Sequence, residues 1–373
     1  MARAPVLQES TTTTSRPASA AGEFVSGRPG SVLGSQTGWT VYLSAGDTLF
    51  AADLDTGRIR SLQLDASAPR EPAGLWLMLT VPGALFASGY RNALVANRDL
   101  SQRTLVRDRS FYGTFPAATG TIWVPHTEGP TSPDLIVDEL DRSGNIARSF
   151  RLHLDNSGID ASSDFHLAGI VGSEFVFEAQ GRIILIDIDS QHARTWAIGA
   201  VVAVGGGRVV WRECTAATTC QTYGGTSANP KAVKLGNVFA NCGPLNEGIV
   251  VSLCPIAITA NGRYVLGEDL DVDWTLRSPE YIDLWDLDTG THTAIKWPTA
   301  KLEPIVGNGY ASGVKGVWPS PDGCWLFALQ ETGRVTAYQV ATGQVVEFDV
   351  IEPLSNPENK IAPAFLHAFA VGS

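Results

Sequence analysis

The stretch YIDLWDLDTG at residues 281–290 is an apolar strand that runs into a tight turn. The same unit returns as LFAADLDTG at residues 49–57 and as VTAYQVATG at residues 335–343. Each of these copies ends on a glycine, which adopts the positive φ of a tight turn without steric cost. Less regular copies occupy residues 94–101, 135–144 and 183–191. The chain is therefore built from a repeated strand–turn unit.

The spacing of these turns gives the size of the repeat. Successive turn residues lie 44, 43, 47, 99 and 53 residues apart. We interpret the interval of 99 as two repeats, with an eroded copy near residues 231–238. A period of about 45–50 residues is typical of a four-stranded propeller blade, and seven blades fit residues 36–373 at about 48 residues each. Six or eight blades would need about 56 or 42 residues each and fit less well. The sequence predicts an all-β fold, a single β-propeller of about seven four-stranded blades.

The two ends of the chain are expected to play different parts. Residues 364–371, AFLHAFAV, have the pattern of the first strand of a blade. A ring that stayed open would expose an edge strand to other chains. We therefore expect this C-terminal strand to close the ring by docking beside residues 39–44. Residues 1–35 are rich in Thr, Pro and Gly and are predicted to be a flexible tether ahead of a propeller domain at 36–373.

Composition narrows the function classes. The chain is 44% hydrophobic and 17% charged, which suits a large core and argues against disorder. The net charge of −11 repels phosphate backbones, so we expect no nucleic-acid partner. No run approaches the roughly 18 apolar residues of a membrane-spanning helix, so we expect no membrane insertion. Residues 1–10 lack the apolar core of a signal peptide.

The repeats resemble a known group of propellers. SPDG at residues 320–323, VTAYQVATGQ at 335–344 and IDLWDLDTG at 282–290 are similar to WD40-like and YVTN-like repeats. The resemblance covers residues 36–373 and implies the fold without implying any one activity. No blade has the Gly-His dipeptide of regular WD40 units, and only residues 285–286 supply the Trp-Asp pair. Quinone-binding propellers share the turn, but no adjacent cysteine pair is present, so we expect no such cofactor.

Loop lengths suggest a binding face. In a four-stranded blade, the second–third and blade-to-blade connections share one face, and here they are long: 65–74, 125–134, 155–165, 212–230, 240–249, 267–280, 298–314 and 350–363. Repeat proteins often bind on the face where insertions collect. The alternative is that long loops drift freely, because closure entropy rises slowly with length. The candidate binding residues on these loops are His126, Glu128, Asp134, Asp164, His166, Asp269, Asp271, Asp273, Trp274 and Arg277.

Metal binding has one candidate. Glu268, Asp269, Asp271 and Asp273 place oxygen ligands at alternating positions, a pattern that suits Ca²⁺. No glycine follows to turn the loop and no later Glu closes a 12-residue frame, so a solvated acidic loop is the alternative reading. The six histidines form no metal-ligand spacing, and no nucleophile elbow or phosphate loop is present.

The five cysteines bear on the compartment. Cys214 and Cys220 are spaced for a disulfide across a hairpin, Cys242 and Cys254 form a second close pair, and Cys324 is left over. Buried free thiols are the alternative, because cysteine packs as a small hydrophobe. The hairpin pair resembles those of exported actinobacterial propellers, and disulfides imply an oxidising compartment.

These observations lead to one hypothesis and two alternatives. We expect a monomeric, extracytoplasmic, non-enzymatic propeller that binds a protein or glycan through its long-loop face. A propeller hydrolase or lactonase with a metal or acid/base site in the central channel is the first alternative. A purely structural domain of a surface assembly is the second.

Overall fold

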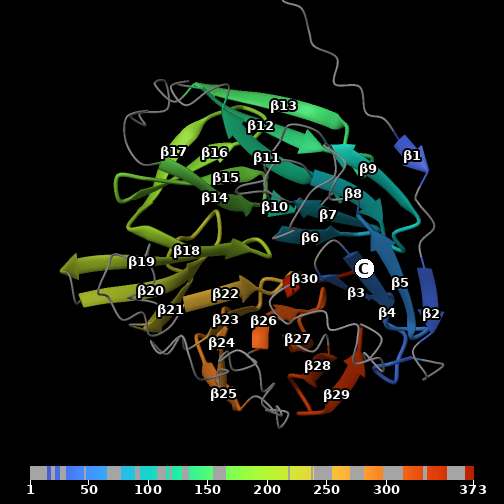
Figure 1. Ribbon diagram of the computed structural model, residues 1–373. Helices are drawn as coiled ribbons and strands as arrows, with labels where there is room; N and C mark the ends of the chain where they lie inside the picture. Colours follow the sequence, from blue (N-terminus) through green and yellow to red (C-terminus); the bar gives the residue numbers. More distant parts are fainter. Residues whose placement is uncertain are drawn as a thin grey trace, which may run out of the picture.

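The computed structural model, drawn in Figure 1, shows an all-β ring. It describes residues 15–17, 22–25, 31–45, 48–64, 77–88, 93–106, 115–116, 120–127, 134–153, 165–216, 219–236, 238, 254–268, 281–296, 314–330, 334–350 and 366–373. Over these ranges the elements are strands, with no helix. In the same part of the chain, no helix of the length and apolarity needed to cross a bilayer occurs.

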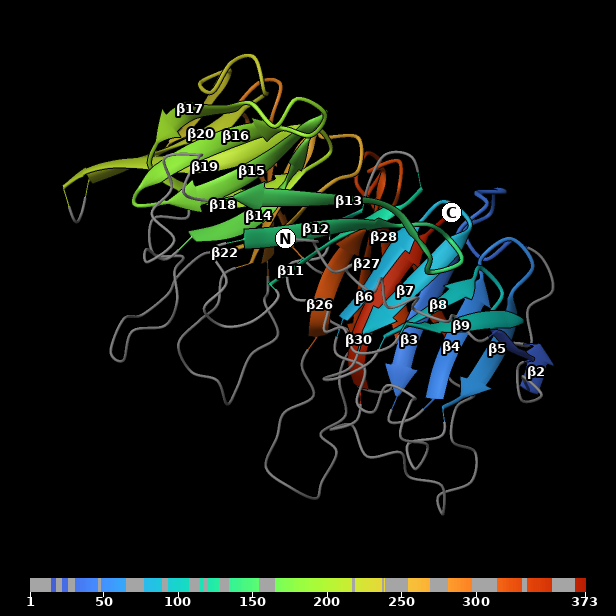
Figure 2. The same ribbon diagram turned by 90° about the horizontal axis from the view of Figure 1, so that it is seen from above.

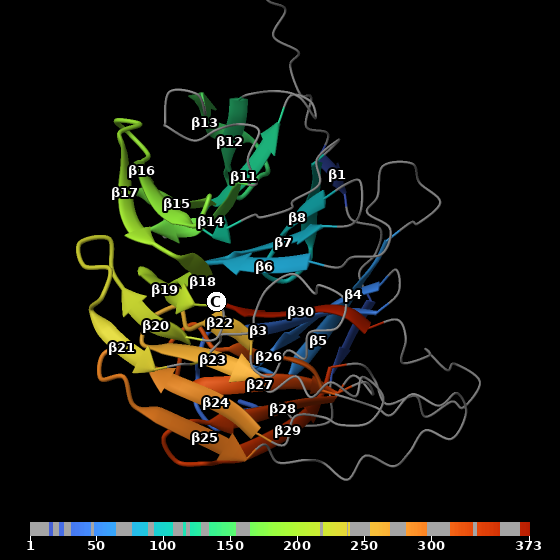
Figure 3. The same ribbon diagram turned by 90° about the vertical axis from the view of Figure 1, so that its left-hand side faces the viewer.

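Seven antiparallel sheets form the blades and follow one another around the ring (Figures 1 and 3). From the innermost strand outward, blade 1 consists of β30 (Leu366–Gly372), β3 (Thr40–Ala45), β4 (Thr48–Asp53) and β5 (Arg58–Gln63). Blade 2 consists of β6 (Leu77–Val81), β7 (Ala84–Ser88), β8 (Ala93–Asn97) and β9 (Gln102–Val106), and blade 3 of β10 (Phe115–Pro116), β11 (Ile122–Thr127), β12 (Asp134–Leu140) and β13 (Ile146–His153). Blade 4 consists of β14 (Phe165–Val171), β15 (Glu174–Ala179), β16 (Arg182–Asp187) and β17 (Ala193–Ile198), and blade 5 of β18 (Ala200–Gly205), β19 (Arg208–Ala216), β20 (Thr219–Gly225) and β21 (Val233–Gly236). Blade 6 consists of β22 (Cys254–Ile258), β23 (Tyr264–Glu268), β24 (Tyr281–Asp286) and β25 (His292–Lys296), and blade 7 of β26 (Val314–Pro319), β27 (Trp325–Gln330), β28 (Arg334–Gln339) and β29 (Val345–Asp349). The prediction of a propeller with about seven four-stranded blades is confirmed.

The ring closes within blade 1. Strand β30 pairs antiparallel with β3, with Thr40 opposite Gly372 and Leu43 opposite Phe369. The last strand of the chain is thus the innermost strand of the first blade, as the pattern of residues 364–371 predicts. Figures 2 and 3 show β30 between β3 and β6 of the next blade. Closure leaves the inner edge of β3 paired, which removes the exposed edge that an open ring would have.

The core lies between the blades. Each junction between neighbouring blades holds one cluster of buried apolar side chains in the described part of the chain. Strand β4 shows why its sequence is apolar throughout: Phe50 and Ala52 face blade 7, whereas Leu49 and Ala51 face blade 2. A strand buried on both faces reads as a continuous apolar run, because successive side chains alternate between the faces. The third strands of the blades are therefore the part of the repeat that is easiest to recognise in the sequence.

The repeated turn has the same geometry in its three regular copies. Gly57 donates its N–H to the main-chain oxygen of Asp53 at 2.9 Å, and Gly290 and Gly343 make the matching bonds at 2.8 and 2.9 Å. All three glycines have φ near +70°. In two irregular copies, Leu100 and Gln191 take this left-handed conformation instead. The turn therefore favours glycine at this position, because glycine takes the left-handed conformation without strain.

The two faces of the ring differ in the strand ends that they carry. We call the face with the first–second and third–fourth strand turns the short-turn face; residues 54–57, 82–83 and 287–291 lie there. The opposite face, the loop face, carries the strand ends that join the second to the third strand and each blade to the next. The predicted loops at 65–74 and 240–249 fall outside the described residues. The same is true of the predicted loops at 155–165, 298–314 and 350–363, except for residues 165, 314 and 350.

One predicted loop is mainly strand. Residues 212–230 are not a single loop-face connection, because residues 212–216 continue β19 and residues 219–225 form β20. Residues 226–230 belong to the next turn, on the short-turn face. The prediction was wrong here because threonines and small residues at 215–219 look like a loop, whereas cross-strand pairing extends the hairpin through them. This segment is an extended two-stranded hairpin.

The predicted tether contributes two edge strands. Strand β1 (Ser15–Pro17) pairs with the outermost strand of blade 2, and β2 (Gly22–Val25) pairs with the outermost strand of blade 1. Both pairings are antiparallel and add a fifth strand to the sheet. The remainder of residues 1–30 lies outside the described part of the chain.

Candidate functional site

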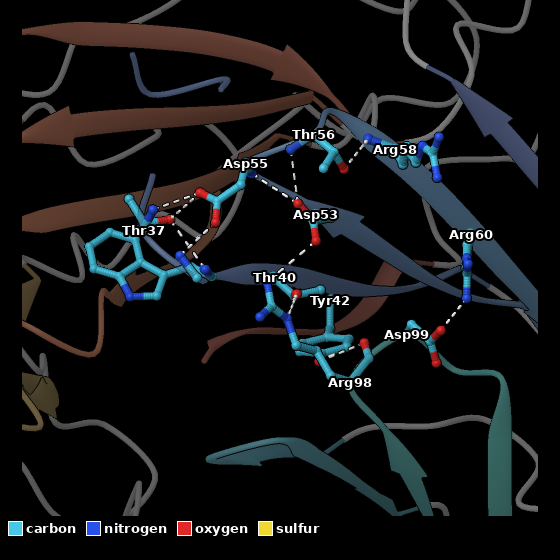
Figure 4. Close-up of polar contacts among 12 residues, drawn as sticks. Thr37, Thr40, Tyr42, Asp53, Asp55, Thr56, Arg58, Arg60, Arg98 and Asp99 are labelled. Carbon is cyan, nitrogen blue, oxygen red and sulfur yellow. Dashed lines mark hydrogen bonds and ion pairs between the residues drawn. The ribbon is translucent and has the colours of Figure 1, made fainter. Parts of the chain in front are cut away.

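A cavity of about 460 Å³ opens on the short-turn face at the junction of blades 1 and 2. Blade 1 contributes the start of β3, the end of β4 and the start of β5, and blade 2 contributes two turns. The lining residues are Thr40, Ala51, Asp53, Thr56, Arg58, Arg60, Gly83, Asn97, Arg98 and Asp99. Figure 4 shows most of these side chains together with the bonds between them.

The turn after β4 shapes one wall of the cavity. Asp53 accepts hydrogen bonds at its Oδ1 from the main-chain N–H groups of Asp55 and Thr56, both at 2.9 Å. A short acidic side chain commonly caps its own turn in this way. Asp286 makes the same two bonds to Asp288 and Thr289 in blade 6. The cavity wall is therefore a standard turn of the repeat, to which blade 1 adds the two arginines that follow on β5.

Asp55 fastens this turn to the segment that precedes β3. Its carboxylate accepts bonds from the Thr37 N–H at 2.6 Å, the Thr37 hydroxyl at 3.1 Å and the Gly38 N–H at 2.7 Å. Burial raises the pKa of the Asp55 carboxyl, but these hydrogen bonds outweigh burial and hold the pKa below its ordinary value. Asp55 therefore stays ionised at neutral pH and keeps the turn in place.

Arg98 links the two blades. Its Nε donates to the hydroxyl of Thr40 at 2.7 Å, and its Nη2 lies 3.4 Å from Oδ2 of Asp53. The hydroxyl of Tyr42 donates to the main-chain oxygen of Arg98 at 2.9 Å. Burial raises the pKa of the Tyr42 hydroxyl far above its ordinary value, so the hydroxyl keeps its proton as a donor. Arg98 is thus held through both its side chain and its backbone.

Arg60 and Asp99 form the second link across the junction. Nη1 of Arg60 on β5 donates to Oδ2 of Asp99 in the β8–β9 turn (Figure 4). Oδ1 of Asp99 also accepts from the N–H and hydroxyl of Ser101, at 3.0 and 2.6 Å. Burial raises the pKa of the Asp99 carboxyl, and the bonds from Ser101 and Arg60 lower it further than burial raises it. Asp99 therefore remains an anion opposite the guanidinium.

The cavity combines fixed charge with hydrogen-bonding groups. Three guanidinium groups and two carboxylates line it, together with the polar side chains of Thr40, Thr56 and Asn97. Arginine stays protonated throughout the physiological pH range. Such a lining can hold a charged or polar ligand by directed hydrogen bonds.

The predicted residues His126 and Asp134 lie in blade 3, where they have separate partners. Nε2 of His126 lies 2.9 Å from Oδ2 of Asp138, whose side chain is 2% exposed. Oδ2 of Asp134 accepts from Nη1 of Arg151 at 2.8 Å. His126 shares its face of β11 with Ile122 and Val124, which pack against blade 2. It therefore lies in the blade 2–blade 3 junction, away from the central channel where the sequence would allow it to meet Asp134.

The other predicted binding residues cannot be placed in the same way. Glu128, Asp164, Asp269, Asp271, Asp273, Trp274 and Arg277 lie outside the described residues, and so does the proposed Ca²⁺ loop with them. His166 is on β14 and Glu268 on β23, and the backbone alone is described at both positions. Elsewhere in the described chain, no three His, Cys, Asp or Glu side chains gather as a metal site would require.

The structure confirms the predicted local pairing for the first pair of cysteines. Cys214 and Cys220 lie directly opposite each other in the β19–β20 hairpin and form a disulfide with a Cα–Cα distance of 4.1 Å. Cys324 is a free, exposed thiol. Cys242 lies outside the described residues, and Cys254 begins β22.

The residues that form the cavity were not singled out from the sequence. Asp53 belongs to the repeated strand–turn unit at residues 49–57, and Arg58 and Arg60 follow this unit closely. Arg98 and Asp99 belong to an irregular copy in the next blade. The one signal in the sequence is the alternation Arg58-Ile59-Arg60 after a turn, which puts two cations on one face of a strand.

Comparison with solved structures finds propellers at low sequence identity. Apo AztD from Citrobacter koseri is 13% identical, with 85% of this chain and 84% of that one covered and a TM-score of 0.45. Hsv2 from Kluyveromyces lactis is 11% identical, with 71% and 74% covered and a TM-score of 0.40. The β-propeller domain of Cps50 (Swd1) from Myceliophteria thermophila is 10% identical, with 75% and 88% covered and a TM-score of 0.41. No family profile and no curated protein sequence matches the chain. The assignment to a seven-bladed, WD40-like propeller fold rests on the strand order itself.

Proposed function

We propose that this chain is a non-enzymatic binding propeller that engages a protein or a glycan through its loop face. The observation that carries the proposal is the strand order, which brings the ends of all second–third and blade-to-blade connections to one face. Broad contacts with a macromolecule need a surface of this extent, about 800 Å² on each partner.

The lengths of the connections support this choice of face. On the loop face, β23 and β24 are joined by residues 269–280, and β25 and β26 by residues 297–313. In blades 6 and 7, the matching connections on the short-turn face are residues 259–263, 287–291 and 320–324, although short connections such as residues 180–181 and residue 199 also occur on the loop face. Binding residues concentrate on long connections held by a rigid scaffold.

The disulfide hairpin supports an exported protein. The β19–β20 turn is a second–third strand connection and belongs to the loop face. A disulfide between Cys214 and Cys220 persists in oxidising compartments and is reduced in the cytosol. We propose an extracytoplasmic location on this ground, in line with the resemblance of its repeats to exported bacterial propellers.

The test is crosslinking capture from the cells that make the protein. The bait is compared with a variant whose residues 128–133 and 269–280 are replaced by short Gly-Ser linkers. Arg263→Gln, on the short-turn face, is the matched control, because its Nε pairs with Asp286 far from these connections. We expect the wild type and R263Q to retain one crosslinked protein or glycan that the shortened variant loses.

Two results would overturn the proposal. One is a partner that the shortened variant retains at the wild-type level. The other is the absence of a specific partner together with turnover of ester or lactone substrates, which would favour the hydrolase alternative.

A further inference from the structure

The lining of the cavity between blades 1 and 2 differs in net charge from the chain as a whole. The net charge of the protein is −11, yet the cavity lining carries three arginines against two aspartates. Cations gathered in a concave site concentrate an anion there, because the low-dielectric walls focus their field. The lining is therefore not acidic in an otherwise acidic protein, which is the first of three observations that favour an anionic ligand.

The second observation concerns the N–H donors that Arg60 and Arg98 do not use within the protein. Each guanidinium carries five N–H donors. Toward the described residues, Arg60 bonds through Nη1 to Asp99, and Arg98 bonds through Nε and Nη2 to Thr40 and Asp53. Nη2 of Arg60 and Nη1 of Arg98 are not used in these bonds. Both guanidinium groups therefore keep donors for a ligand in the cavity that they line.

The third observation is that the arginines are held in place before a ligand arrives. Asp99 fixes Arg60, and Thr40 fixes Arg98, while Tyr42 anchors the backbone of Arg98. The apolar cluster of the junction, which includes Tyr42 and Ala51, packs beneath the cavity. A site that is ordered in advance loses less entropy on binding.

We propose that this cavity binds a small oxyanion, the carboxylate or phosphate group of a soluble ligand, through Arg60 and Arg98. Planar guanidinium groups match carboxylate and phosphate oxygens with paired hydrogen bonds. The hydroxyls of Thr40 and Thr56 lie in the same lining and suit polar substituents on the ligand. A volume of about 460 Å³ fits a small metabolite and is too small for a folded partner. This site lies on the opposite face from the proposed macromolecular surface and does not depend on it.

Titration calorimetry of the whole chain tests the proposal. Sodium phosphate and sodium malonate are titrated separately into the wild type, Arg60→Gln and Arg98→Gln at low salt. We expect saturable 1:1 binding of at least one anion to the wild type, with at least a tenfold loss of affinity in each variant. Binding of phosphate alone would assign a phosphoryl ligand, and binding of malonate alone would assign a carboxylate ligand.

The matched control is Arg208→Gln. Arg208 also pairs with a turn aspartate of the next blade, Asp288, on the short-turn face, but at the junction of blades 5 and 6. We expect R208Q to bind the anion as the wild type does. Melting curves of every variant establish that it is folded. No saturable binding of either anion, or equal losses in R208Q and R60Q, would overturn the proposal, whereas capture of a partner by the loop face would be unaffected.

Discussion

The hydroxyl of Tyr42 in blade 1 donates a 2.9 Å hydrogen bond to the main-chain oxygen of Arg98 in blade 2. Tyr42 is 2% exposed, so water cannot readily replace its hydroxyl as the donor to this oxygen. Tyr42→Phe keeps the ring and removes the donor, which leaves a carbonyl oxygen without this partner. We expect a loss of about 1–2 kcal/mol in the free energy of unfolding. Urea unfolding measures it, and an unchanged midpoint with an unchanged slope would contradict the structural role of this bond.

Two turn glycines should differ in their tolerance of a side chain. Gly290 and Gly343 have φ of +74° and +71°. A Cβ at Gly290 would lie 2.8 Å from the main-chain oxygen of Lys234, whereas at Gly343 the nearest atom would be 3.6 Å away. Gly343→Ala should cost about 1–2 kcal/mol for the left-handed conformation alone. Gly290→Ala should cost more, because it adds a steric clash. Thermal unfolding of the two variants side by side tests this, and equal losses would show that the turn at 290 relaxes freely.

Ring closure predicts the effect of removing the last strand. Deletion of residues 366–373 strips the inner edge of β3 of its partner and uncovers Val41 and Leu43, both fully buried. An exposed, apolar edge strand associates with other chains. We expect the truncated protein to form large aggregates in size-exclusion chromatography. A monomeric product with the wild-type melting temperature would disprove the role of β30 in closure.

Asp55 should make stability depend on pH at the acidic end. The pKa of the Asp55 carboxyl is lowered in the folded state. Its contribution to the free energy of unfolding is therefore fully present above the pKa of Asp55 in the unfolded chain, about 3.9, and is lost as pH falls through the lower pKa of the folded state. Asp55→Asn keeps one acceptor oxygen for Thr37 and turns the other position into an amide that cannot accept from Gly38. We expect this variant to be less stable at pH 7 and to lose less stability between pH 5 and pH 3, as followed by urea unfolding at each pH. Parallel curves for both proteins would contradict the assignment.

The disulfide should act locally. The Cys214–Cys220 bridge joins residues six apart in sequence, and a ring this short is expected to stabilise the hairpin by about 2 kcal/mol. We expect the Cys214→Ser/Cys220→Ser double variant to be cleaved faster within residues 213–221 in limited proteolysis, with little change in the global melting temperature. Cys324→Ser, which removes the free thiol, is the control and should leave the cleavage rate unchanged.

The sequence predicted the fold, but it did not predict the cavity. Strands such as Thr48–Asp53 bury their four central residues between two blades, and a glycine in the left-handed conformation ends the turn that follows, so sequence and structure reflect the same constraint. The prediction of a loop at residues 212–230 was wrong because Thr-rich strands of a hairpin resemble a loop in sequence. Pairing between β19 and β20 makes most of this segment strand. Arg60 and Asp99 come from different blades, and only the ring brings them together. The sequence of one repeat does not show which turn of the next blade its residues will contact.

The pairing of β30 with β3 also constrains the order of events during synthesis. β3 leaves the ribosome early, and its partner follows about 330 residues later, so blade 1 waits with one edge unpaired while the other blades form. This long-range contact makes closure a late and slow step in folding. During the wait, the last strand of a second copy can dock on β3 in place of the chain's own strand. At high expression levels we therefore expect the same feature that closes the ring to favour strand-exchanged dimers.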